Sequence, residues 1–124
     1  MKIVITVTSP TFDSEVDPRF GRGAYLLVVD LDTLEWRAQS NPGVTSSGGA
    51  GIAAAQFVTG QEVDAVISGD FGPHAFQALD AANLPMYVLG NCRTVREVVA
   101  QFTAGQLQRV GEPTREDCHA EGQG

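Results

Sequence analysis

Hydrophobic residues fall into runs of two different periods along this chain. A continuous, mostly β-branched run covers residues 2–7, which is typical of a strand buried on both faces. Two further strand patterns follow at residues 23–30 and 34–39, and a short polar turn at 30–33 joins them. We expect these two strands to pair as a hairpin, with Trp36 on the covered face.

Helix and strand patterns alternate beyond the glycine-rich stretch that ends at Gly51. The predicted helices cover residues 52–58 and 73–82 and a segment that begins after Thr94; the predicted strands cover residues 63–68 and 84–89. Pro73 suits the first turn of its helix. Thr94 and Glu97 have the spacing of a capping box, and the apolar residues that follow Thr94 form one helical face.

The resulting order, β-β-β-α-β-α-β-α, predicts an α/β fold with a mixed five-stranded sheet and helices on both faces. Right-handed crossovers place the strands at 2–7, 63–68 and 84–89 side by side and parallel, with the hairpin on the other flank. We expect a single domain over residues 1–107 and a polar, flexible C-terminal tail over residues 108–124.

Composition excludes several classes of protein. Among 124 residues, 15 acids outnumber 8 bases, and the net charge of −7 argues against general binding to nucleic acid or anionic lipid. No apolar run approaches the ~18–20 residues of a membrane span, and residues 2–7 do not resemble a signal peptide. Two cysteines make no disulfide framework. We therefore expect a cytoplasmic protein with reduced thiols.

Ligands of such sheets bind beyond the carboxyl ends of the parallel strands. The long polar loop at 8–22 and the turns at 69–74 and 90–93 should converge there. Glycines at 69 and 72 would let the backbone approach a ligand closely. The alternative is that these segments are ordinary tight turns.

Two segments have the chemistry of an anion site. Ser47, Gly48 and Gly49 precede a helix, where backbone N–H groups and the positive end of the helix dipole attract anions. Arg19 and Arg22 flank an aromatic residue in a chain that is short of cations. The alternative for the arginines is an internal ion pair with Asp17.

Candidate metal ligands are few. His74 lies in the first turn of a predicted helix, where a neutral, metal-competent imidazole is favoured, and a solvent-facing ring is the alternative. Cys92 follows the last strand and could bind a soft metal as thiolate, or be a buried inert thiol. Cys118 and His119 are adjacent in the polar tail, and their role is open.

The chain contains no convincing catalytic constellation. No Ser or Cys has a credible His and acid partner, so we expect no enzyme activity. A cluster of Asp13, Asp17 and Asp70 at the sheet edge would suit a divalent-metal phosphodiesterase, which is the less favoured alternative. A regulatory interaction domain that binds no cofactor is the other alternative.

A set of short motifs in a fixed order resembles the dinitrogenase iron–molybdenum cofactor biosynthesis family, which includes nitrogenase cofactor carriers and molybdenum–copper orange proteins. The motifs are the opening strand, Asp17 to Arg22, Asn41-Pro42, Gly49-Ala50-Gly51-Ile52 and Gly72-Pro73-His74-Ala75-Phe76. The resemblance covers residues 1–107 and implies a ribonuclease-H-like fold. Family members often carry His before Gly-Ala-Gly, and Gly48 stands there in this chain.

The resemblance implies noncovalent binding of an anionic metal–sulfur cluster that contains molybdenum with copper or iron. It also implies a protein that donates or accepts this cluster. Such a cluster needs N–H donors, positive charge and an apolar wall. The resemblance thus implies that backbone donors come from Ser47 and from the glycines at 48, 49, 69 and 72. It implies that Arg19 and Arg22 supply the positive charge, with His74 and Cys92 as possible metal ligands. The apolar wall would consist of Phe12, Phe20 and Phe71.

Overall fold

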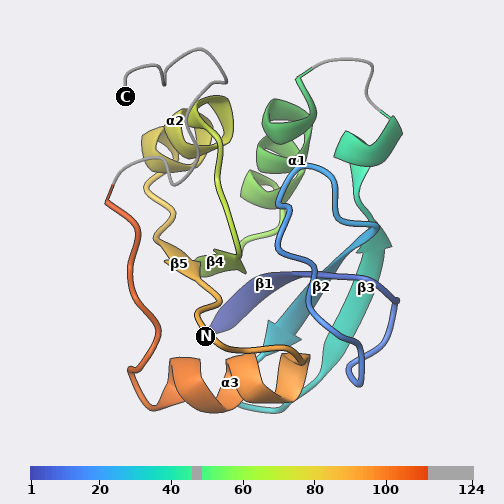
Figure 1. The fold of residues 1–124 in the computed structure, drawn as a ribbon, viewed down its shortest axis with the longest axis vertical. Coiled ribbons are helices and arrows are strands. Elements are labelled where there is room, and N and C mark those ends of the chain that lie inside the picture. Colours follow the sequence, from blue (N-terminus) through green and yellow to red (C-terminus); the bar gives the residue numbers. More distant parts are fainter. Residues whose placement is uncertain (46–48, 112–124) are drawn as a thin grey trace.

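The computed structural model describes residues 1–45 and 49–111 (Figure 1). Its elements are β1 (Lys2–Val7), β2 (Tyr25–Asp30), β3 (Trp36–Ser40), the 3₁₀ turn η1 (Pro42–Thr45), α1 (Ala50–Thr59), β4 (Ala65–Ser68), α2 (Pro73–Ala81), β5 (Met86–Val88) and α3 (Val95–Thr103). The strands form one sheet in the order β3-β2-β1-β4-β5. β1 pairs antiparallel with β2 and parallel with β4, and β4 pairs parallel with β5. The predicted α/β fold is confirmed, with a topology consistent with the ribonuclease-H-like class.

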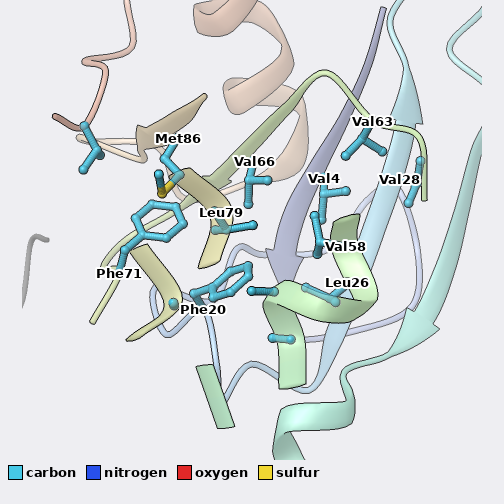
Figure 2. Close-up of a cluster of buried hydrophobic side chains, with 14 residues drawn as sticks. Val4, Phe20, Leu26, Val28, Val58, Val63, Val66, Phe71, Leu79 and Met86 are labelled. Carbon is cyan, nitrogen blue, oxygen red and sulfur yellow. The ribbon is translucent and has the colours of Figure 1, made fainter. Parts of the chain in front are cut away.

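Helices cover both faces of the sheet, as the element order predicts (Figure 1). Successive strand residues point to opposite faces. Val4 and Val66 therefore pack under α1 and α2, in the cluster that Figure 2 shows. Ile3, Ile5 and the other alternate residues pack against α3. β1 is thus buried on both sides, which explains its uninterrupted apolar pattern.

The predicted capping box starts α3. The Thr94 hydroxyl accepts a hydrogen bond from the Glu97 backbone N–H at 3.2 Å, and the Glu97 carboxylate accepts one from the Thr94 N–H at 3.2 Å. Both bonds satisfy N–H groups that a helix start leaves without partners. α3 then buries Val95 and Val98 against the sheet. In the part of the chain that the structure describes, no helix is long and apolar enough to cross a membrane.

The expectation that Trp36 lies on a covered face is wrong. Trp36 is 43% exposed, because β3 is the outer strand of the sheet and has no strand on its other side among the described residues. Only Ala38 of β3 packs against the core on that face. A hairpin pattern in the sequence does not say how far the covering helix reaches.

Contacts with the sheet continue through residues 108–110. Gln108 accepts a hydrogen bond from the Val88 N–H at 3.0 Å, and the Val110 N–H donates to Met86 at 2.8 Å. Val110 is also part of the buried cluster under α1 and α2. The segment at 108–110 therefore lies along the outer edge of β5.

The long loop between β1 and β2 is held to the sheet at several points. The Asp17 N–H donates to the Thr6 carbonyl at 2.8 Å, and the Thr6 hydroxyl donates to the Asp17 carbonyl at 2.7 Å. The Asp70 N–H donates to Pro18 at 2.7 Å. The loop is also held to the segment after β5, because the Val16 N–H donates to the Arg93 carbonyl at 2.9 Å. The loop is therefore a fixed part of the fold.

The backbone at Gly69 passes so close to this loop that only glycine fits. A Cβ added there would lie 2.4 Å from the Cβ of Pro18. We predict that Gly69→Ala lowers the free energy of unfolding by about 2 kcal/mol or more, because the loop must move away from β4. Chemical denaturation monitored by circular dichroism measures the change.

Gly60→Ala is the matched control. The nearest atom to an added Cβ at Gly60 is the Phe57 carbonyl oxygen at 3.5 Å, an ordinary contact. We expect its midpoint to stay within experimental error of the wild type. Equal stability of the two variants would contradict the packing of Gly69 against Pro18.

Candidate functional site

The three segments expected at the carboxyl ends of the parallel strands do meet there. Backbone bridges join Arg19 to Asp70 and Glu15 to Thr94. Between them lies a cleft of about 510 Å³. It is lined by Glu15, Val16 and Pro18 of the loop, Gly69 after β4, and Leu89, Gly90, Cys92 and Arg93 after β5. The cleft carries one acid and one base, so it has no net charge to attract an anion.

Cys92 lines this cleft but is only 6% exposed. Burial, and next the charge of Glu97, raise the pKa of the Cys92 thiol above its ordinary value. The thiol is therefore protonated near neutral pH and is a poor ligand until it loses its proton. Within residues 1–45 and 49–111, no three His, Cys, Asp or Glu side chains gather into a metal site.

Arg19 forms the internal ion pair that was the alternative at the sequence level. Its Nε and Nη2 donate to the two carboxylate oxygens of Asp17, each at 3.1 Å, and its backbone N–H donates to Oδ1 at 3.0 Å. The Asp17 side chain is 5% exposed and that of Arg19 60% exposed. The bonds to Asp17 raise the pKa of Arg19. The charge of Arg19 is thus largely offset by Asp17.

A second place of convergence lies at the starts of α1 and α2. An added Cβ at Gly51, in the first turn of α1, would lie 3.0 Å from the Cβ of Ala75 in the first turn of α2. An added Cβ at Gly21 would lie 2.9 Å from the Gly51 nitrogen. The loop residue next to Arg22 therefore touches the start of α1, which in turn touches the start of α2.

This second place has the donors that an anion needs. Neither helix has a side-chain cap, because Gly49 precedes α1 and Gly72 precedes α2. Among the described residues, no side chain caps the first backbone N–H groups of either helix. Arg22 is exposed, and the described residues give its guanidinium no carboxylate partner. His74 is exposed in the first turn of α2.

The three phenylalanines expected to form one wall lie in different places. Phe20 and Phe71 are 1% and 0% exposed, with ring centroids 5.4 Å apart, in the core under α1 and α2 (Figure 2). Phe12 lies on the other face, where the Arg96 guanidinium sits 4.9 Å from its ring centroid. Phe20 and Phe71 present almost no surface to a ligand, and Phe12 faces α3.

Two of the three acidic residues considered for a phosphodiesterase are paired with different arginines, while Asp70 lies beside Arg19. Asp13 pairs with Arg96 at 2.7 Å, whereas Asp17 pairs with Arg19. Each of these two carboxylates is thus already engaged by a different arginine. Ser47 and Gly48 lie outside the described residues, as do Cys118 and His119.

Asn41 has a role that the sequence pattern did not reveal. Its side chain is buried, Nδ2 donates to the Phe20 carbonyl at 2.9 Å, and Oδ1 accepts from the Gly43 N–H at 3.0 Å. Asn41 thereby joins the loop that carries Arg22 to the turn η1. In the sequence, Asn41-Pro42 is one of the family motifs and by itself indicates a turn, which does not reveal this contact.

Known proteins share this fold and sequence pattern. Residues 1–105 match the dinitrogenase iron-molybdenum cofactor family. The apo form of the orange protein from Desulfovibrio gigas is 38% identical, with a TM-score of 0.86 over 92% of this chain and 96% of that one. An NMR structure from Thermotoga, of a proposed NifB protein assigned to the DUF35 family, is 25% identical, with a TM-score of 0.79 over 94% and 98%.

A protein of Methanocaldococcus jannaschii without a characterised function is also similar. It is 21% identical over 109 residues, which are 86% of this chain and 92% of that protein. The motifs that suggested the family at the sequence level fall within the matched range. The chain belongs to the dinitrogenase iron-molybdenum cofactor family.

Proposed function

We propose that this protein binds an anionic metal–sulfur cluster noncovalently and stores or transfers it without catalysis. The family, named for the iron–molybdenum cofactor, and the likeness to the orange protein support a role connected with such clusters. The cargo on this proposal is a sulfide cluster that contains molybdenum with copper or iron. A protein that donates or accepts the cluster is its expected partner.

The observation that carries the proposal is the meeting of two helix starts, each preceded by glycine in place of a capping side chain, at the loop residue that precedes Arg22. Sulfide ligands of a cluster accept hydrogen bonds, and the N–H groups at a helix start are fixed donors at the positive end of the dipole. α1 and α2 bring two such sets together, since Gly51 lies against Ala75. Arg22 is exposed and follows Gly21, which lies against Gly51, so the loop brings a full positive charge to this region.

The glycines at these positions are part of the same argument. Gly49 has a φ of 69°, in the left-handed region, and an added Cβ there meets no atom of the described residues within 4 Å. A bulky anion can therefore approach the start of α1 on that side. Gly72 similarly replaces a capping side chain that would occupy the donors of α2.

Of the two candidate metal ligands, His74 fits this location and Cys92 does not. His74 is exposed in the first turn of α2, among the proposed donors. Cys92 lines the cleft, as Pro18 of the loop does. Gly21 of the same loop lies instead against the start of α1, so the loop separates Cys92 from the helix starts. We therefore assign a direct metal bond, if one forms, to His74.

We predict that the apo protein retains colour and molybdenum after incubation with tetrathiomolybdate and copper or iron, followed by desalting. Arg22→Gln should weaken retention about tenfold, because a hydrogen bond to a charged group contributes about 1.5–3 kcal/mol. The measurements are visible absorbance and metal content per chain. Titration with the metal salts gives the apparent affinity.

Arg37→Gln is the control for the loss of one positive charge. Arg37 lies on β3 and donates to Gln61, beyond the C-terminal end of α1, so it is far along α1 from the proposed site. We expect its retention to match the wild type. Absence of colour and metal from the wild-type protein under all conditions would reject cluster binding and favour an interaction domain.

We also predict that cluster retention does not depend on Cys92. Burial raises the pKa of Cys92, so a metal could bind its sulfur only by displacing the thiol proton. Retention through Cys92 would therefore increase steeply from about pH 7 to about pH 9. Backbone donors and arginine do not titrate in this range. Cys92→Ser should therefore keep the wild-type metal content and leave its pH profile unchanged. Loss of the cluster in Cys92→Ser would instead place the cargo in the cleft.

A further inference from the structure

The two outer edges of the sheet differ. The outer edge of β5 is covered by the segment at 108–110, through the bonds from Val88 to Gln108 and from Val110 to Met86. The outer edge of β3 has no such cover among the described residues, and β3 lies at the open end of the sheet (Figure 1). All of its side chains are exposed except that of Ala38, which is half-buried.

Among the described residues, the outward-facing backbone donors and acceptors of β3 have no strand partner. The Asp30 N–H donates to Glu35, and the Asn41 N–H donates to Ala24, in the same register that pairs Arg37 with Val28. In an antiparallel pair, residues that bond to the neighbour alternate with residues that face away. The N–H and C=O groups of Trp36, Ala38 and Ser40 therefore point away from β2.

Two of the four large apolar residues that are exposed in the described chain lie in the β2–β3 hairpin, and a third is bonded to it. The large apolar residues exposed in the described chain are Met1, Leu34, Trp36 and Ile52. Leu34 and Trp36 belong to the β2–β3 hairpin, and the Met1 carbonyl accepts a bond from Leu31 in that hairpin. An exposed tryptophan next to an unpaired strand edge is the kind of surface that proteins bury in an interface.

The charged residues at the start of β3, Glu35 and Arg37, indicate which strand could pair with this edge. Glu35 and Arg37 lie two residues apart, on the same face of the sheet, on either side of Trp36. Neither has an ion-pair partner in the described part of the chain. An antiparallel strand of the same sequence, centred on Trp36, would place Glu35 opposite the second copy's Arg37 twice.

We propose that the β3 edge pairs antiparallel with the β3 edge of a second copy of this chain, with the two-fold axis at Trp36. The two Trp36 residues then exchange N–H···O=C bonds and pack against each other on one face of the joined sheet. On the other face, two Glu35–Arg37 pairs form across the interface. This proposal is independent of the cluster-binding function.

Other registers of the same edge are less favourable. A shift of the centre to residue 37 would put the two Arg37 side chains directly opposite each other. A centre at Ala38 would put Arg37 opposite Gln39 and leave both charges without opposite partners. Only the register centred on Trp36 pairs each of these charges with its opposite. Because the β5 edge is covered, such pairing closes as a dimer and does not extend into a fibre.

Charge reversal tests this register on the full-length chain. We expect the wild type to change from monomer to dimer between about 5 µM and about 1 mM in sedimentation equilibrium. Arg37→Glu should raise the dissociation constant at least about tenfold, because Glu35 then faces glutamate twice. The double variant Glu35→Arg with Arg37→Glu restores the opposite pairs and should return the constant to near the wild-type value.

A control variant and a fluorescence measurement complete the test. Arg93→Glu carries the same change of charge far from β3, beside the cleft, and should leave dimerisation within about twofold. Fluorescence of Trp36, the single tryptophan, should shift to shorter wavelength as the wild type associates. A wild type that stays monomeric, or a dimer that the double variant fails to restore, overturns the proposal. If the wild type is monomeric, a strand of another protein becomes the partner to test for the β3 edge.

Discussion

The attachment of the β1–β2 loop to the ends of β1 and β4 is the constraint on which the rest of this structure depends. Thr6 and Ser68 are fully buried, with hydroxyl oxygens 2.7 Å apart, and the Thr6 hydroxyl donates to the Asp17 carbonyl. Buried polar groups left without partners cost about 1–3 kcal/mol each. The loop therefore cannot leave the sheet cheaply, and Gly69 provides the room for it to lie there.

Because the loop is fixed, its residues are divided between two sides. Pro18 lines the cleft beyond the parallel strands, while Gly21 lies against the start of α1. Asp17 holds Arg19 in a bidentate pair, whereas Arg22, next to Gly21, has no carboxylate partner among the described residues. One arginine of the motif thus stabilises the loop, and the other is available to an anion. The division gives the proposed site its charge in a chain with a net charge of −7.

Much of the fold follows from local patterns, whereas the candidate site follows from them only in part. The element order, the parallel strands and the capping box at Thr94 were all predictable, because periodicity and caps depend on residues near in sequence. Phe20 lies in a polar loop and suggested an exposed wall, yet its ring packs on Phe71 in the core. That contact joins residues 51 positions apart, which no local pattern encodes. The role of Asn41 was hidden for the same reason.

The sequence alone determined which segments form strands and helices, the order of the sheet and the family motifs. These depend on side-chain periodicity, on helix caps and on the handedness of crossovers. Tertiary structure decided which arginine is neutralised, which phenylalanines are buried, and that Trp36 stands on an open edge while the segment at 108–110 closes the other. Such outcomes depend on where distant segments meet, and the free energy of burial and pairing is realised only when the whole chain has packed.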